Sequence, residues 1–250
     1  MTALITGASS GIGRDMARIL SNRGYDLILV ARRIDRLEEL KNELPTKVEC
    51  ISLDLSDSNA CVKLHSLTKD RDVDILVNNA GFGLFGAFDE TDLDRELNMI
   101  DVNIKAVHTL TKLFLIDFKK RNSGYILNVS SLAGFMPGPL LSGYYATKAY
   151  VLRLTYALHE ELRRSKSNVY IGALCPGPVK TEFDEVADVR FSLKGLTSEY
   201  VAKYAVDKMF KRKLVIVPGM TNRFLTVLTK VSPTALTARI NYKMQKRKHS

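Results

Sequence analysis

Short apolar runs alternate along this chain with longer segments in which apolar residues recur every three or four positions. The short runs are typical of strands, and the longer segments have the periodicity of amphipathic helices. The predicted strands are ALIT (3–6), DLILVA (26–31), KVECISLDL (47–55), VDILVNNA (73–80), GYILNVSS (124–131), NVYIGALCP (168–176) and KLVIVP (213–218). The predicted helices are 11–23, 34–43, 57–68, 92–121, 143–165 and 197–211.

The order of these segments predicts a doubly wound α/β fold. Several strands are apolar on both faces, as expected when helices cover a parallel sheet on both sides. Crossover connections are almost always right-handed, which yields an open Rossmann-type sheet, here of about seven strands. Ligands of such sheets bind beyond the carboxyl ends of the strands, near the point where strand order reverses. We therefore expect the functional residues at the strand ends.

Length and composition narrow the class of protein. A chain of 250 residues with 46% apolar content and no Pro/Gly-rich linker fits a single domain with a full-sized core. No stretch is long and apolar enough to cross a bilayer, and the first residues, MTALITGASSG, do not resemble a signal peptide. Cys50, Cys61 and Cys175 lack metal-ligand spacing. We expect free thiols, a cytoplasmic location and no bound metal.

The net charge of +10 is concentrated near the C-terminal end. Residues 203–250 contain twelve Lys and Arg and a single acidic residue, Asp207, whereas residues 1–202 are close to neutral. A nucleic-acid-binding protein is expected to spread its basic residues over one face of the fold. We therefore expect no nucleic-acid partner, and a separate role for the basic segment.

The sequence TGASSGIG, from Thr6 to Gly13, lies between the first predicted strand and the first predicted helix. Gly7 permits a tight turn, Gly11 lets the backbone approach a diphosphate, and Gly13 allows close packing of helix on strand. The helix start adds unpaired N–H groups and the positive end of the helix dipole. Glycines also form ordinary turns, but this position predicts a dinucleotide-binding loop.

The end of the second predicted strand, LILVARR, indicates which dinucleotide binds. An acid here would bind the adenosine ribose of NAD(H), whereas an arginine can bind a 2′-phosphate through paired hydrogen bonds. Ala31 stands in the place of the acid, and Arg32 follows it, with Arg33 placed to assist. The alternative is that both arginines are solvated residues at a helix start. We predict NADP(H) in preference to NAD(H).

The sequence YYATK (144–148) places Tyr144 and Lys148 four residues apart, on one face of a predicted helix. A half-buried aromatic ring beside a solvated lysine would give this pattern. So would a phenol, of ordinary pKa about 10, whose pKa a neighbouring ammonium lowers toward the working pH. In the second interpretation, Tyr144 exchanges a proton with a substrate.

Six motifs together resemble those of the short-chain dehydrogenase/reductases, in their single-domain, NADP(H)-preferring form. They are TGASSGIG (6–13), NNAG (78–81), DVN (101–103), NVSS (128–131), YYATK (144–148) and PGPVKT (176–181). They follow the order and spacing of that family from residue 2 to about residue 217. The resemblance implies an oxidoreductase that transfers a hydride between NADP(H) and a carbonyl compound or secondary alcohol.

The resemblance also implies site residues. The implied catalytic residues are Asn103, Ser131, Tyr144 and Lys148. The implied cofactor-binding residues are Gly7, Ser9, Ser10, Gly11, Ile12, Gly13, Arg32, Arg33, Asp54, Leu55, Asn79, Ala80, Gly81, Tyr144, Lys148, Pro176, Gly177, Val179 and Thr181. Spacing favours Ser131 over Ser130, and only Tyr144, not Tyr145, fits YxxxK. Some NADP-dependent members have a basic residue where this chain has Ser10, so the cofactor preference depends mainly on Arg32.

In the mechanism that these residues allow, Tyr144 is the general acid and base, and the Ser131 hydroxyl stabilises negative charge on the substrate oxygen. The resemblance suggests that Lys148 also holds the nicotinamide ribose and that Asn103 relays protons through water. An acyl-carrier-linked 3-ketoacyl reductase is a narrower form of this hypothesis. A non-catalytic dinucleotide-binding sensor or scaffold is the alternative from another class, although a sensor does not need proton-transfer groups.

Two apolar, glycine-containing segments flank the catalytic residues. Their apolar residues line a substrate pocket or pack in a core or subunit interface; they are Phe82, Leu84, Phe85, Phe135, Met136, Leu140 and Leu141. Residues 182–196 fall where the family has its substrate lid. By analogy with the family, we also expect a homodimer or homotetramer formed through 92–121 and 143–165.

We assign residues 1–220 to the catalytic domain and 221–250 to a basic C-terminal extension of it. The sequence of this extension predicts two short amphipathic segments, broken at Pro233. Three interpretations remain for it. It folds onto the body as a flap, it lies on a membrane surface, or it contacts an acidic protein partner such as an acyl carrier protein.

Overall fold

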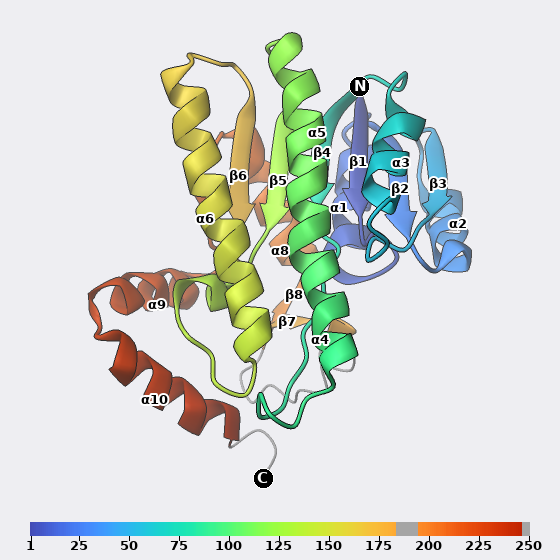
Figure 1. The fold of residues 1–250 in the computed structure, drawn as a ribbon. Helices are drawn as coiled ribbons and strands as arrows, with labels where there is room; N and C mark the ends of the chain where they lie inside the picture. Colours follow the sequence, from blue (N-terminus) through green and yellow to red (C-terminus); the bar gives the residue numbers. More distant parts are fainter. Residues whose placement is uncertain (184–194, 247–250) are drawn as a thin grey trace.

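The computed structural model describes residues 1–183 and 195–246. All seven predicted strands form one parallel sheet, as the sequence predicted (Figure 1). In spatial order the strands are β3 (Val48–Ser52), β2 (Asp26–Ala31), β1 (Thr2–Thr6), β4 (Val73–Asn78), β5 (Tyr125–Val129), β6 (Tyr170–Leu174) and β9 (Val215–Ile216). The predicted lid, residues 182–196, lies largely outside the described residues.

Helices cover both faces of the sheet, because successive strand residues point to opposite sides and both sides are apolar. In β1, Ile5 packs into the core cluster with α1 (Gly11–Ser21), α2 (Ile34–Glu43) and α8 (Ser198–Phe210). Its neighbour Leu4 packs into the opposite cluster with α3 (Ala60–Thr68), α5 (Val107–Lys120) and α6 (Ser142–Arg164). The predicted three-layer α/β architecture is confirmed.

The segment predicted as one helix at 92–121 is interrupted. It consists of α4 (Leu93–Ile100), a π-helical turn (η1, Asp101–Ala106) and α5. Such turns rotate the residues that follow them and occur often at functional sites. Here the turn contains Asn103, whose side chain is fully buried. A small second sheet, of β7 (Val179–Lys180) and β8 (Leu196–Thr197), was not predicted.

The strand order reverses between β1 and β4. From β1 the sheet grows through β2 to β3 on one side, and from β4 through β5 and β6 to β9 on the other. The loops that follow β1 and β4 therefore lead away from each other and leave a crevice at the carboxyl ends of the strands. The motifs TGASSGIG and NNAG lie in these two loops, and NVSS and PGPVKT lie at the carboxyl ends of β5 and β6.

The C-terminal extension forms two helices, α9 (Met220–Val231) and α10 (Thr234–Lys246), broken at Pro233 as predicted. They project beside the carboxyl ends of the strands, at the lower left of Figure 1. No helix in the described residues has the length and apolar character needed to cross a bilayer. All three cysteines are free.

Candidate active site

A cavity of about 600 Å³ lies at the carboxyl ends of the strands. It brings together most of the residues that the sequence predicted: Gly7, Ser9, Ser10, Gly11, Ile12, Arg32, Arg33, Asp54, Leu55, Asn79, Ala80, Gly81, Ser131, Tyr144, Lys148, Pro176, Gly177, Val179 and Thr181. Two predicted residues, Gly13 and Asn103, do not line this cavity and lie behind it.

The phosphate loop follows β1 and starts α1. Gly11 has φ +54°, and a Cβ there would lie 2.8 Å from Thr181 Cγ2, so only glycine fits between the loop and the PGPVKT segment. The side-chain amide of Asn79 holds the loop by donating to the carbonyls of Thr6 and Gly7, both at 3.0 Å. Gly13 packs against this same amide, which explains its place behind the cavity.

Arg33 and Arg36 form a basic cluster at the entrance beside β2. Arg33 Nη2 donates to Ser9 Oγ at 3.2 Å and to Ser10 Oγ at 3.3 Å, and it pairs with Glu182 at 2.8 Å. The other carboxylate oxygen of Glu182 pairs with Arg36. These two cations lower the pKa of Glu182, the hydrogen bond from Arg33 being the largest cause. One carboxylate therefore occupies an anion site made by two guanidinium groups.

Arg36 and Glu182 were missed by the sequence analysis. Arg36 follows Arg33 by one helical turn in RRIDR, which is a signal that was available. Arg32, on which the predicted preference depends, is exposed and lies near Asp54. Burial has the largest influence on the pKa of the Asp54 carboxyl and raises it, but hydrogen bonds from the Ser56 backbone and hydroxyl, with a smaller contribution from Arg32, bring this pKa below its ordinary value.

Tyr144 and Lys148 meet at the other end of the cavity, on α6. Lys148 Nζ lies 5.8 Å from the centre of the Tyr144 ring and donates to the Val129 carbonyl at 3.0 Å. Burial of the ammonium, 5% exposed, lowers its pKa to about 8. Gly81 makes room for it, because a Cβ there would lie 3.2 Å from Lys148 Nζ.

The pKa of Tyr144 differs from the expectation. Burial is the largest cause and raises it above its ordinary value, Tyr145 adds to the rise, and the Ser131 hydroxyl opposes it. The ammonium of Lys148 donates to the Val129 carbonyl. In the chain as described, burial therefore outweighs any lowering by Lys148, and the net shift of the Tyr144 pKa is opposite to the predicted one.

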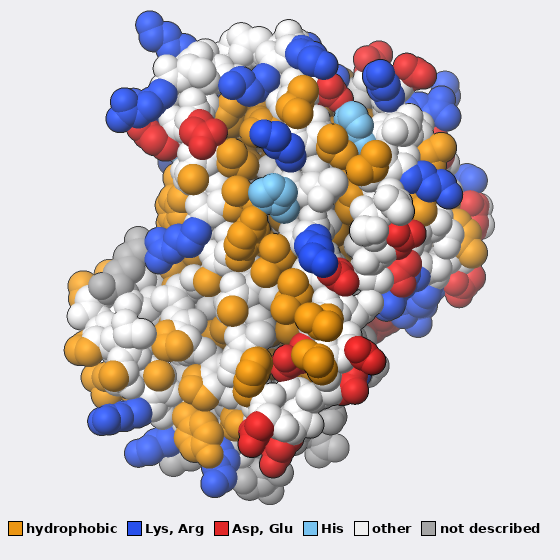
Figure 2. Space-filling model, in the orientation of Figure 1, with side chains coloured by type: hydrophobic (Ala, Val, Ile, Leu, Met, Phe, Trp, Pro, Cys, Tyr) orange, Lys and Arg blue, Asp and Glu red, His pale blue; other side chains and the backbone are white. Residues whose placement is uncertain are grey.

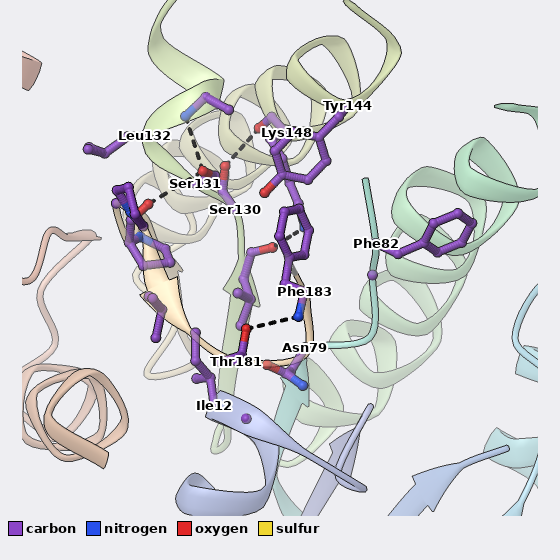
Figure 3. A pocket seen from close by; sticks show the side chains of 18 of the residues that line it. Ile12, Asn79, Phe82, Ser130, Ser131, Leu132, Tyr144, Lys148, Thr181 and Phe183 are labelled. Atoms are coloured by element: carbon purple, nitrogen blue, oxygen red, sulfur yellow. Dashed lines mark hydrogen bonds between the residues drawn. The ribbon is translucent and has the colours of Figure 1, made fainter. Parts of the chain in front are cut away.

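The two candidate serines have different partners. Ser130 is buried, and its hydroxyl donates to the backbone carbonyl of Lys148 at 2.8 Å. Ser131 lines the cavity and caps a short 3₁₀ helix (η2, Leu132–Phe135), where its hydroxyl accepts from the Ala133 N–H at 3.1 Å and donates to the Pro176 carbonyl at 3.4 Å. It also lies close enough to the Tyr144 phenol to lower the pKa of that group. Figure 3 shows Ser131, Tyr144 and Lys148 converging on one region of the cavity. This geometry supports the choice of Ser131.

The side chain of Asn103 forms hydrogen bonds mainly with the backbone of Phe82. Its Nδ2 donates to the Phe82 carbonyl at 2.8 Å and to Thr147 Oγ1 at 3.1 Å, and its Oδ1 accepts from the Phe82 N–H at 3.1 Å. These bonds join the loop after β4 to α6, one residue before Lys148. Asn103 thus positions the lysine, and its predicted role in proton relay stays a prediction.

The substrate end of the cavity is only partly as predicted. Phe82, Met136 and Leu141 line it. Four other expected residues, Leu84, Phe85, Phe135 and Leu140, are not among the lining residues. Of these, Leu84 is buried in the core, while Phe135 and Phe85 pack against buried clusters, so the packing interpretation holds for them.

Other apolar lining comes from outside the two segments predicted to line the pocket. Phe183, at the start of the predicted lid, has its ring tilted against that of Tyr144, with ring centres 5.2 Å apart. The helices α9 and α10 contribute Leu225, Leu228, Ile240 and Met244. Gln245 of α10 donates to the Tyr145 hydroxyl at 3.0 Å, so Tyr145 ties the C-terminal helix to the residue next to Tyr144.

Comparison with known proteins agrees with this geometry. The model of the short chain dehydrogenase family matches residues 1–189. A probable NADP-dependent dehydrogenase of Haemophilus influenzae is 39% identical over 191 residues, which are 74% of each chain.

Two solved structures resemble the whole fold. One is a short-chain dehydrogenase from Sphingobium yanoikuyae in complex with NADPH, 31% identical with a TM-score of 0.82, covering 94% of this chain and 97% of that one. The other is the bulky-bulky ketone specific alcohol dehydrogenase of Comamonas testosteroni, 28% identical with a TM-score of 0.77, covering 94% and 95%. The chain belongs to the short-chain dehydrogenase family of oxidoreductases.

Proposed function

We propose that the protein is an NADP(H)-dependent oxidoreductase that interconverts bulky apolar carbonyl compounds and their alcohols, with Tyr144 as the proton donor and acceptor. The observation that carries the proposal is the arrangement of one continuous cavity. A basic, glycine-rich end suits a phosphorylated dinucleotide, and a half-buried Ser131–Tyr144 pair lies at the apolar end. The NADPH complex of the Sphingobium relative and the ketone named for the Comamonas relative support both halves.

The residues present fit the dinucleotide. The loop around Gly11 approaches Thr181 so closely that no side chain can stand between them. Ser9 and Ser10 supply hydroxyls, and the start of α1 supplies N–H groups for a diphosphate. Arg33 and Arg36 already pair with the carboxylate of Glu182, which supports a role for this cluster in binding an anionic group. In our proposal, Arg32, Arg33 and Arg36 bind the 2′-phosphate.

When bound, NADPH supplies a hydride to the carbonyl carbon. The chain's own residues then manage the charge that forms on the carbonyl oxygen. The Ser131 hydroxyl donates a hydrogen bond to that oxygen, and the Tyr144 phenol gives it a proton. A phenol whose pKa is raised by burial keeps its proton at neutral pH, which suits the reduction direction.

Lys148 stabilises the negative charge that proton transfer leaves on Tyr144. The tyrosinate formed on Tyr144 is a buried anion, and the ammonium of Lys148 on the same helix face is the nearest residue able to stabilise it electrostatically. With a pKa of about 8, Lys148 remains largely protonated at neutral pH. Asn103 holds the loop that adjoins this ammonium. The lysine thus acts on the anion formed in the reaction, and the neutral phenol persists before it.

A screen of NADPH oxidation over ketones and aldehydes graded by size and polarity tests the proposal. We expect turnover to increase with apolar bulk on both sides of the carbonyl, and NADPH to be preferred to NADH. Arg32→Asp is expected to reverse the cofactor preference, because it restores an acid beside the ribose.

Two results would contradict the proposal. Equal turnover of NADH and NADPH by the unaltered protein would remove the role of the arginines. Tight NADPH binding without turnover of any carbonyl would favour a non-catalytic dinucleotide-binding protein.

A further inference from the structure

The C-terminal helices expose a large apolar surface, only part of which also lines the cavity. Ten of the twenty large apolar side chains exposed in the described residues belong to α9 and α10. Met220, Phe224, Val227 and Val231 recur at helical spacing and share the outer face of α9. Their side chains are 85%, 68%, 60% and 77% exposed. A helix that is apolar on its outer face as well as toward the cavity is stabilised by a covering surface.

A basic stripe runs beside this apolar surface. Arg239, Lys243 and Lys246 recur at helical spacing on α10, and all three are exposed. Leu236 and Ile240 form the neighbouring apolar stripe of the same helix. Figure 2 shows apolar side chains gathered where Figure 1 places α9 and α10, with Lys and Arg along the lower rim. The helix pair thus combines an apolar face with a basic edge.

The same helices connect this surface to the cavity. Leu225, Leu228, Ile240 and Met244 line the cavity and are also 37%, 46%, 48% and 46% exposed. Each of these side chains therefore faces both solvent and the substrate end of the site. They therefore offer an apolar molecule contacts both on the outer surface and on the cavity wall.

Helix α10 is held at the substrate end by polar contacts. Besides the bond from Gln245 to Tyr145, Asn241 Nδ2 donates to the Pro137 carbonyl at 2.8 Å. Pro137 belongs to the loop that leads into α6 and its Tyr144. A surface that binds α10 thus lies one contact away from the catalytic residues.

The charge of α9 and α10 indicates which kind of partner covers their apolar face. Residues 220–246, which form α9 and α10, contain five Lys and Arg and no acidic residue, so pairing this face with a second copy would bring two positively charged surfaces together. An anionic lipid surface is complementary in both respects, because it offers negative headgroups beside an apolar interior. Basic amphipathic helices of this kind lie in the plane of such an interface.

We propose that the α9–α10 face docks on the surface of an anionic lipid bilayer and that apolar carbonyl substrates enter the cavity from it. The second half rests on the proposed oxidoreductase function, and the first half does not. The described helices lie on the bilayer and do not span it.

Sedimentation of the full chain with vesicles tests the docking. Vesicles of phosphatidylcholine mixed with phosphatidylglycerol are compared with vesicles of phosphatidylcholine alone, at low and high salt. We expect binding to the anionic vesicles that is at least about tenfold stronger than to the neutral ones and that weakens with salt.

Two pairs of variants separate the apolar and the basic contributions. Phe224→Gln with Val231→Gln removes apolar area from the outer face, at residues that do not line the cavity. Arg239→Glu with Lys243→Glu reverses two charges. We expect each pair to weaken binding to anionic vesicles by at least about tenfold. The retained thermal transition of each variant shows that it folds.

Matched controls lie on α3 and at Lys69, which directly follows it; α3 covers the sheet far from the C-terminal helices (Figure 1). Val62→Gln with Leu67→Gln removes two similarly exposed apolar side chains. Lys63→Glu with Lys69→Glu makes the same change in net charge at exposed positions. We expect both controls to bind vesicles as the unaltered protein does.

Several outcomes would overturn the docking proposal. One is the absence of binding to anionic vesicles, and another is an equal loss in the α3 controls, which would indicate adsorption by net charge. A dimer that Phe224→Gln with Val231→Gln converts to a monomer would assign the face to a second copy. Competition by polyglutamate at equal concentration of negative charge would assign it to an acidic protein.

Activity measurements keep the two proposals distinguishable. A long-chain ketone is presented in anionic vesicles, and a small water-miscible ketone is presented without them. We expect Phe224→Gln with Val231→Gln to lower kcat/KM for the vesicle-borne ketone by about tenfold and to leave that for the small ketone unchanged. Equal kcat/KM of variant and parent for the vesicle-borne ketone would overturn entry from the bilayer. No turnover of either ketone by the parent would refute the proposed function while leaving vesicle binding intact.

Discussion

The two ends of the cavity use charge in opposite ways. At the dinucleotide end, Arg33, Arg36 and Glu182 have side chains about 40% exposed and pair with one another in contact with water. At the catalytic end, Lys148 is almost fully buried, and burial displaces the pKa values of both Lys148 and Tyr144. Exposed pairs are screened and contribute modestly, whereas buried groups undergo the large pKa changes that proton transfer uses. The first end is therefore suited to selecting a ligand and the second to chemistry.

Replacing Tyr144 tests the catalytic end most directly. We expect Tyr144→Phe to lower kcat by about a thousandfold, because the proton donor is lost, and to leave the Kd for NADPH within about threefold. Tyr145→Phe is the matched control and is expected to cost less than about tenfold, since its hydroxyl bonds Gln245. Retention of half the rate by Tyr144→Phe would show that the proton comes from another group.

Burial of the Lys148 ammonium predicts a pH dependence of the unfolding free energy. Its pKa is lowered from 10.5 to about 8 in the folded chain, so between these values the unfolded chain binds more protons and the folded state gains stability as pH rises. We expect the unfolding free energy of the parent to rise relative to Lys148→Met by on the order of 3 kcal/mol across this window. Urea unfolding without dinucleotide at about pH 7 and about pH 10 measures the difference, and a constant gap would refute the burial cost.

The two adjacent serines are expected to have different roles, Ser131 in catalysis and Ser130 in stability. Ser131→Ala is expected to lower kcat by about a hundredfold, as for the loss of one oxyanion donor, with little change in stability. Ser130→Ala removes the buried bond to the Lys148 carbonyl and is expected to cost about 1 kcal/mol of unfolding free energy, with a smaller effect on kcat. Steady-state kinetics and urea unfolding of both variants decide this, and the reverse pattern would exchange the roles.

The smallest effect is expected at the exposed end. Glu182 neutralises Arg33 and Arg36, so a 2′-phosphate competes with its carboxylate. We expect Glu182→Gln to tighten NADPH binding by about threefold to tenfold at low salt and to leave NADH binding nearly unchanged. Calorimetric titration with both dinucleotides measures this. Weaker NADPH binding would mean that Glu182 supports the arginines in the bound state.

Local patterns predicted much of the molecule. The seven strands could be located because a strand apolar on both faces and an amphipathic helix each have a periodicity contained within a few residues. The phosphate loop and the Tyr144–Lys148 pair were found for the same reason, since each lies within one turn or one strand–helix junction. The break at Pro233 was also local, because proline cannot continue a helix.

Contacts between segments that are distant in the sequence could not be predicted from such local patterns. The pairing of Arg36 with Glu182, the bond of Gln245 to Tyr145 and the clamp of Asn103 on the Phe82 backbone each join separate elements. The π-helical turn that carries Asn103 was not predicted, because the apolar periodicity of 92–121 continues through it. The pKa of Tyr144 was predicted in the wrong direction, since its burial is contributed by several segments.

The sequence by itself determined the doubly wound sheet, the glycine-rich loop after β1 and the placement of Tyr144 and Lys148 on one helix face, because these depend on the periodicity and spacing of neighbouring residues. Only the tertiary structure decided that α9 and α10 form part of the cavity wall, that Lys148 points to the Val129 carbonyl, and that Glu182 shares the arginine cluster. These features depend on which distant surfaces meet and exclude water, and burial of that kind sets both the pKa values and the shape of the site.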